Sequence, residues 1–283
     1  MKVTLLGTGS PEAHVRRASS GYLVEVGADR ILLDCGGGVF DRLLQSGRRP
    51  SDITHIVFSH LHSDHMMDYA RLVHAAWDEG GVPIKVYGPK PIGVISEKLF
   101  GRDGVFAHDL VARTEHPASQ EVWKSRGGQL PRPWPSPHIT EILPGFSLAG
   151  PNWSLTTCEV PHAQPYLSCM ALRIDTARAK FVYSGDAGPC DTLPKLAQGA
   201  DLLLHWCYRT ARETKNANLA SKTTSPADIA SLAQRAKVKR LVVTHLRAHM
   251  DTDDTHGEIM RQLRSGFDGP SSIAEDLMVF DLP

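Results

Sequence analysis

The sequence has no excess of charge of either sign and no long hydrophobic run. Its 283 residues include 31 basic and 31 acidic side chains, so the formal net charge is +0 with neutral histidines. Because no global basic field is available to gather nucleic acid, RNA or DNA is a less favoured partner, although a local patch is not excluded. No apolar stretch is long enough to suit a membrane crossing. A membrane partner is therefore not expected, and bulk charge alone points to no particular ligand.

The cysteines form no recognisable framework. There are five of them, and none belongs to a C-x-x-C pair: Cys35, Cys158, Cys169, Cys190 and Cys207. This scatter disfavours both a disulfide scaffold and a thiolate zinc knuckle. The apolar run after Met1 is ended by Gly7, too soon for the hydrophobic region of a signal peptide. We therefore expect reduced cysteines and a cytoplasmic location.

Strand and helix patterns alternate along the chain. Apolar runs predict strands at about 2–6, 21–26, 30–35, 53–59, 84–88, 153–160, 166–174, 179–184, 201–205, 239–244 and 277–282. Helical periodicity appears at about 38–46 and 66–79, and a second pair of helices is expected at about 226–237 and 252–265. Ser225 and Pro226 suit the N-cap and first position of one of them. The alternation predicts a layered α/β fold in one domain over 1–283.

Residues 101–138 interrupt this rhythm. They include Trp123, Trp134 and a proline-rich run, with little periodicity. Such a segment is expected to be a long loop or lid, or else a surface insertion packed on its own tryptophans.

The most informative segment is an apolar strand that runs directly into potential metal ligands. These follow Ser59 within six positions: His60, His62, Asp64 and His65. Imidazole nitrogens and a carboxylate oxygen suit Zn²⁺, and a set of nitrogen and oxygen ligands leaves positions open for water, as catalytic zinc sites require. The pattern thus favours a catalytic zinc site over a structural one.

Four further apolar runs end in a residue of ligand type. These residues are His162, Asp186, His205 and His245. Because strand ends on one edge of a sheet can converge in space, we expect them near the first group.

The pattern from His60 to His65 resembles the H-x-H-x-D-H signature of the metallo-β-lactamase superfamily. The resemblance covers almost the whole chain, in family order, through Leu5–Ser10, Leu32–Gly36, His162, Ser184–Asp186 and Thr244–His245. It implies an αββα sandwich of two mixed β-sheets flanked by helices. It also implies about two zinc ions per chain: one held by His60, His62 and His162, the other by Asp64, His65 and His245, with Asp186 bridging them. Asp34 resembles the family's carboxylate that orients a ligand histidine, or it caps the glycine-rich turn that follows it.

A zinc-bound hydroxide is the expected nucleophile, since two zinc ions lower the pKa of a shared water. A Gly-x-Ser-x-Gly elbow is absent, which disfavours a serine nucleophile. The complete ligand set favours a zinc-dependent hydrolase. The alternative from another class is a catalytically silent, metal-containing module that recognises a metabolite.

Within the superfamily the sequence is most similar to the branch of tRNase Z and the zinc arylsulfatases, with two departures. His205-Trp-Cys-Tyr208 replaces the His-Glu-Ala-Thr of tRNase Z, and Thr223-Thr-Ser225 replaces its His-Ser-Thr, whose histidine helps the leaving group depart. Few positive charges are available to bind the phosphate backbone of RNA: those of Lys124, Arg126 and Arg132. We therefore expect a small, aryl-type ester, sulfate, phosphodiester or halogenated substrate. A tRNase Z-like RNA endonuclease is the alternative.

The remaining expectations concern residues near the predicted metals. Asp64 and His205 are expected to be catalytic, with His205 protonating a leaving group or holding a substrate oxygen, unless it is an interior histidine. Trp206 and Tyr208 are expected to form an aromatic wall against the substrate, or else to pack in the core. A homodimer is compatible with the sequence.

Overall fold

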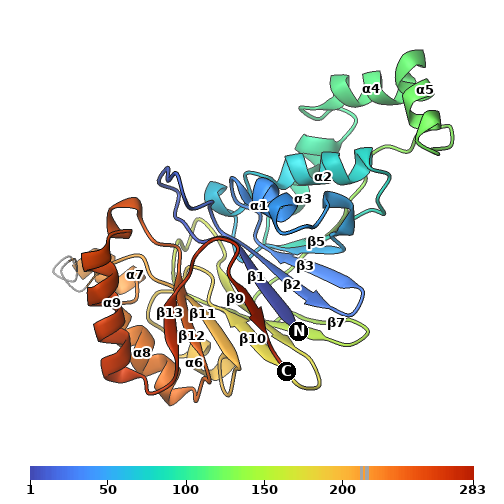
Figure 1. The fold of residues 1–283 in the computed structure, drawn as a ribbon. Coiled ribbons are helices and arrows are strands. Elements are labelled where there is room, and N and C mark those ends of the chain that lie inside the picture. Colours follow the sequence, from blue (N-terminus) through green and yellow to red (C-terminus); the bar gives the residue numbers. More distant parts are fainter. Residues whose placement is uncertain (211–212, 214–216) are drawn as a thin grey trace.

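The computed structural model describes residues 1–210, 213 and 217–283, and two packed β-sheets form its centre (Figure 1). The first sheet has seven strands in the order β14-β1-β2-β3-β4-β5-β6. Their bounds are β14 Val279–Asp281, β1 Lys2–Gly7, β2 Gly21–Val26, β3 Asp29–Leu33, β4 His55–Val57, β5 Lys85–Gly88 and β6 His138–Glu141. The chain starts and ends in this sheet, where β1 and β14 pair antiparallel.

The second sheet also has seven strands, in the order β13-β12-β11-β10-β9-β8-β7. Their bounds are β13 Ser271–Ile273, β12 Leu241–Thr244, β11 Leu202–Trp206, β10 Lys180–Tyr183, β9 Met170–Asp175, β8 Ser154–Glu159 and β7 Ser147–Ala149. Both sheets mix parallel and antiparallel pairs, for example β10 with β11 and β10 with β9.

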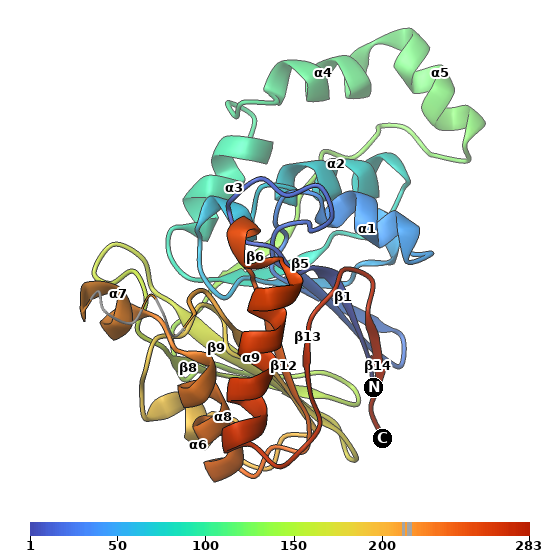
Figure 2. The same cartoon turned by 60° about the vertical axis from the view of Figure 1, so that its left-hand side comes forward.

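Helices cover the outer face of each sheet. The first sheet carries α1 Val39–Gln45, α2 Tyr69–Asp78 and α3 Ile92–Phe100, and the second carries α6 Thr192–Leu196, α8 Pro226–Arg235 and α9 Asp253–Gly266 (Figures 1 and 2). A short helix, α7 Ala217–Lys222, precedes α8. The N-cap of α8 is as predicted, because Ser225 Oγ accepts a hydrogen bond from Asp228 N at 3.2 Å.

Alternation along the strands creates three buried layers. In β2, Tyr22 and Val24 pack between the sheets, whereas Leu23 packs against α1 and α2. In β11, Leu204 likewise faces the first sheet and Leu203 faces α8. Strands buried on both faces read as continuous apolar runs, which is why the sequence revealed them. The predicted αββα sandwich is confirmed.

Residues 101–138, expected to be a long loop or lid or else a surface insertion packed on its own tryptophans, are partly helical. The segment contains α4 Ala107–Glu115 and α5 Pro117–Ser125, which stand out from the sandwich beyond α2 and α3 (Figures 1 and 2). It is held to α2 by Arg132, whose guanidinium lies 3.7 Å from the ring centre of Trp77 and 4.5 Å from that of Trp123. Exposed helices with few apolar positions give a weak periodic signal, since only Leu110 is buried in the pair.

Other departures from the predicted elements are small. The strand expected from 166 begins at Met170, and the short elements β6, β7, β13, α3, α6 and α7 were not predicted. Within the described part of the chain, no helix has the length and apolar character needed to cross a membrane.

Candidate metal centre and active site

The predicted ligands follow strand ends at one edge of the sandwich. His60 and His62 lie in the loop after β4, and Asp64 and His65 form a 3-10 turn, Ser63–His65. Parallel pairing of β3 with β4 places Asp34 beside this loop. Backbone φ is positive at Asp34 (57°), Gly185 (54°) and His245 (64°), all at turns that present the site. Glycine adopts this conformation without strain, whereas at Asp34 and His245 it is strained, and such strain clusters at functional sites.

A first group of ligand atoms comes from His60, His62 and His162, which together could hold a metal ion. His62 Nδ1 lies 3.0 Å from His60 Nε2 and 3.2 Å from His162 Nε2. Burial lowers the pKa of His60 well below its ordinary value and lowers that of His162 to about 4. These imidazoles are therefore neutral at pH 7, the state in which a nitrogen lone pair can bind zinc.

A second group comes from Asp64, His65 and His245. Asp64 Oδ2 lies 3.1 Å from His245 Nε2 and 3.4 Å from His65 Nε2. Burial acts to raise the pKa of Asp64, but these two histidines hold it well below its ordinary value, so the carboxylate is ionised.

Asp186 lies between the two groups. Its Oδ2 is 3.4 Å from His245 Nε2, 3.6 Å from His65 Nε2 and 3.7 Å from His162 Nε2. Three buried atoms of the cluster have no hydrogen-bond partner among the described residues: His65 Nε2, Asp186 Oδ1 and His245 Nδ1. Buried polar atoms without partners are costly, and a bound cation would satisfy those that face the centre. The nitrogen and oxygen donors therefore fit a bound metal ion.

Asp34 contacts one of the predicted ligand histidines directly and a second through Ser59. Its Oδ2 accepts hydrogen bonds from His65 Nδ1 at 2.8 Å, Ser59 Oγ at 2.8 Å and Tyr183 Oη at 3.0 Å. Because Ser59 donates to Asp34, its oxygen is free to accept from His60 Nδ1 at 3.0 Å. Both histidines then keep Nε2 for the centre. Tyr183 and Ser59 were not predicted, although each directly adjoins a motif that was: Ser184–Asp186 and His60–His65.

A cavity of about 230 Å³ opens beside the cluster. Its walls are Pro11, His62, Asp64, His162, Asp186, Trp206, Tyr208, Leu219, Lys222, Thr223 and His245. Trp206 and Tyr208 both line this cavity, and Trp206 is only 2% exposed. Their ring centres are 5.2 Å apart, and the Trp206 ring also lies edge-on to His162 at 5.0 Å.

His205 is placed differently from the expectation. Its side chain is completely buried, is not among the walls of this cavity, and lies on the face of β11 that it shares with Leu203 and Cys207, against the helices. Nδ1 is 2.7 Å from the carbonyl oxygen of Trp206, and burial lowers the pKa of His205 to about 4. The expectation of direct contact between His205 and the substrate is corrected accordingly, because a side chain on this face is turned from the site.

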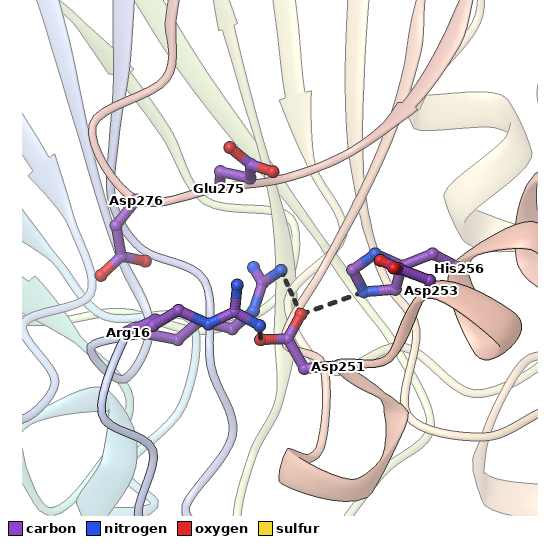
Figure 3. Close-up of a pocket in the computed structure, with 7 residues that line it drawn as sticks. Arg16, Asp251, Asp253, His256, Glu275 and Asp276 are labelled. Carbon is purple, nitrogen blue, oxygen red and sulfur yellow. Dashed lines mark hydrogen bonds and ion pairs between the residues drawn. The ribbon is translucent and has the colours of Figure 1, made fainter.

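Loops from the two ends of the chain support the cavity. Pro11 belongs to a loop fastened by Asp251, whose carboxylate lies within 3.0 Å of nitrogens of His14, Arg16, Arg17 and His256. Figure 3 shows Asp251 between Arg16 and His256. Arg247 lies 5.0 Å from the ring centre of Tyr208 and pairs with Glu12 and Glu213.

Comparison with known proteins shows to which family the chain belongs. Residues 29–246, which span every predicted ligand, match the family model described as a β-lactamase superfamily domain. Ribonuclease Z of Mycobacterium bovis (strain BCG / Pasteur 1173P2) is 30% identical over 259 residues, covering 87% of this chain and 85% of the relative.

Solved structures agree on the fold. The metallo-β-lactamase fold protein YhfI from Bacillus subtilis superposes with a TM-score of 0.77 at 21% identity, covering 99% of this chain and 98% of that one. The short form of human tRNase Z has a TM-score of 0.72 at 20% identity, with complete coverage of both chains. With a family model that spans the whole ligand set, the chain belongs to the metallo-β-lactamase superfamily and is a metal-dependent hydrolase.

Proposed function

We propose that this protein hydrolyses phosphodiester bonds with the aid of two zinc ions, and that RNA is its substrate class. The observation that carries the proposal is the alignment with ribonuclease Z relatives over 87% of the chain, together with a family match that spans all seven ligand positions. This reverses the preference derived from the sequence, which placed a small aryl substrate first and regarded nucleic acid as a less favoured partner.

The residues divide the work of such a reaction. The two ligand groups would hold zinc, which would supply a nucleophile at neutral pH by lowering the pKa of a bound water molecule. Asp34 and Ser59 hold His65 and His60 in the tautomers that present Nε2 to the centre. Trp206 and Tyr208 exclude water from one side of the cavity and provide a flat surface for a ring of the substrate.

A second candidate is a small aryl phosphodiester. The aromatic wall of Trp206 and Tyr208 favours it, and so does the charge of the protruding segment. Residues 101–138 contain five arginines and lysines against four acidic residues, which is a weak attraction for an RNA backbone.

A substrate panel separates these candidates. Zinc-loaded protein is incubated with a precursor tRNA that carries a 3′ extension, bis(4-nitrophenyl) phosphate, 4-nitrophenyl acetate and 4-nitrophenyl sulfate. We expect cleavage of the RNA and of the phosphodiester, both abolished in His62→Ala. Turnover of bis(4-nitrophenyl) phosphate without RNA cleavage would select the second candidate. Turnover of only the acetate or the sulfate would refute a phosphodiesterase.

A further inference from the structure

Arg247 supports one wall of the cavity beside the predicted metal ligands. It is the second residue after His245, its side chain is partly buried, and it is not among the described residues that line the cavity. Its guanidinium carbon lies 5.0 Å from the ring centre of Tyr208, which does line the cavity. A guanidinium over an aromatic ring is attracted to the face of that ring. Arg247 therefore favours one position of the Tyr208 ring.

The guanidinium of Arg247 also binds two carboxylates from different parts of the chain. Its Nε donates to Glu12 Oε1 at 3.1 Å, and its Nη1 donates to Glu213 Oε1 at 2.8 Å. The second oxygen of Glu12 accepts from the backbone N–H of Ala248 at 2.8 Å. Glu12 directly follows Pro11, which also lines the cavity. These contacts fasten the N-terminal loop that carries Pro11 to the segment after β12.

The carboxylate of Glu213 fixes the chain just beyond Tyr208. Its Oε2 accepts a hydrogen bond from Thr210 N at 2.9 Å, while its Oε1 is bound by Arg247. Thr210 is two residues after Tyr208, so the same arginine holds both the ring and the neighbouring backbone of this wall. A planar guanidinium has five donors and two faces, which lets it bind two carboxylates and stack on a ring at once. The single ammonium of a lysine cannot replace it in all three contacts.

We propose that Arg247 is a positioning residue that fixes the Tyr208 ring in the cavity wall and thereby sets the affinity for the aromatic ring of a phosphoryl substrate. Arg247 acts through Tyr208, on which the substrate ring packs. A wall that is already ordered binds more tightly, because less conformational freedom is lost when the ligand enters. The inference rests on the proposed function in one respect, the use of Tyr208 as a surface for a ring of the substrate.

Calorimetric titration of zinc-loaded protein with two phosphonates tests this role without turnover. Phenylphosphonate carries an aromatic ring and methylphosphonate does not, and neither has an ester bond to hydrolyse. Arg247→Met keeps the stem of the side chain but removes the guanidinium. The variant should bind phenylphosphonate about 5- to 10-fold more weakly than the wild type, the size of one aromatic contact. It should bind methylphosphonate like the wild type, whereas general damage to the site would weaken both ligands.

Two further variants separate action through Tyr208 from other effects. Tyr208→Leu should lose the preference for the phenyl group, and adding Arg247→Met to it should weaken phenylphosphonate binding no further, because the two changes remove one shared contact. Arg71→Met is the matched control. Arg71 on α2 also lies over an aromatic ring, that of Phe40 at 3.9 Å, and pairs with Asp41, both on α1. This control should bind both phosphonates like the wild type.

Zinc content is measured on the same samples. Equal losses of affinity for the two phosphonates, loss of zinc from Arg247→Met, or a further loss in the double variant would overturn the proposal. A wild type that binds phenylphosphonate no better than methylphosphonate would overturn it too. Should Arg247→Met fail to fold, Arg247→Lys decides, since it keeps the charge without the planar guanidinium and should still lose affinity for phenylphosphonate alone. Because binding is read without catalysis, this proposal and the phosphodiesterase proposal can fail separately.

Discussion

The hydroxyl of Tyr183 donates a 3.0 Å hydrogen bond to Asp34 Oδ2, the oxygen that also accepts from His65 Nδ1. Both side chains are almost fully buried, so this contact links the core between the sheets to the candidate metal centre. Asp34 retains two hydrogen bonds from Ser59 if the tyrosine is changed, which should preserve the fold.

Tyr183→Phe should therefore weaken zinc binding more than it weakens folding. Loss of an outer hydrogen bond to a ligand's partner typically costs about 10- to 100-fold in metal affinity. Competition with a chromophoric chelator measures this. Tyr87→Phe, on the half-buried strand β5, serves as the control and should leave zinc affinity unchanged. Equal affinities for Tyr183→Phe and Tyr87→Phe would contradict the prediction.

Asp186→Asn should reduce the zinc content from about two ions per chain, because this carboxylate lies between the two ligand groups. Zinc should raise the melting temperature of the wild type and raise that of the variant much less. In the metal-free forms the two proteins should melt similarly, since Asp186 lies at the edge of the sheets. Elemental analysis measures the zinc content, and calorimetry measures the melting temperatures with and without zinc. If metal-free Asp186→Asn melts at as low a temperature as a core mutant, Asp186 has a structural role.

His205 should make the stability of the metal-free protein depend on pH. Its pKa is about 4 in the fold because of burial, against about 6.5 when unfolded. As pH falls from about 6.5 toward 4, His205 becomes protonated in the unfolded chain but stays neutral in the folded chain. The stability that is present above pH 6.5 is therefore lost. The full loss is on the order of 3 kcal/mol.

Urea unfolding at several pH values measures this loss. The unfolding free energy of His205→Gln should decline less steeply with falling pH than that of the wild type. That of His138→Gln, at an exposed position on β6, should follow the wild type. Parallel profiles for His205→Gln and the wild type would show that His205 does not titrate in this range. In kinetics, His205→Gln should change the rate by the same factor for substrates with good and with poor leaving groups, because the buried side chain does not reach the leaving group.

Asp251→Asn should loosen the N-terminal loop that supplies Pro11 to the cavity. Its side chain is 2% exposed and pairs with that of Arg17, which is 5% exposed. Breaking one partner of a buried pair costs about 3 kcal/mol. Burial acts to raise the pKa of Asp251, but Arg17 and then Arg16 hold it below its ordinary value. The contribution is thus present above about pH 4 and lost as pH falls further.

The unfolding free energies of wild type and Asp251→Asn should accordingly converge in acid. Asp253 is an exposed residue that lines, together with Asp251, the pocket drawn in Figure 3. Asp253→Asn is the control, and its unfolding free energy should match that of the wild type at every pH. A constant gap between Asp251→Asn and wild type down to pH 2 would argue that packing, not charge, explains its effect.

The sequence by itself determined the features that depend on local order. Continuous apolar runs identified most strands of the sandwich, because strands buried on both faces contain few polar positions. Ser225 and Pro226 marked the start of α8 through capping chemistry. The spacing from His60 to His65 predicted a metal-binding loop, since four ligand-type side chains in six positions are rare outside such a site, and the structure brings these side chains together.

Only the tertiary structure decided which distant side chains meet. Tyr183 reaches Asp34 across 149 positions of sequence, and no local pattern reports a hydrogen bond between two sheets. His205 and Trp206 are adjacent in β11 but face opposite sides of the sheet. Trp206 lines the cavity and His205 faces the helices, because successive side chains of a strand point to opposite faces. The helices α4 and α5 escaped detection because they bury little apolar surface. The close approach of the Lys222 and Gly188 backbones likewise depends on packing that composition and spacing do not encode.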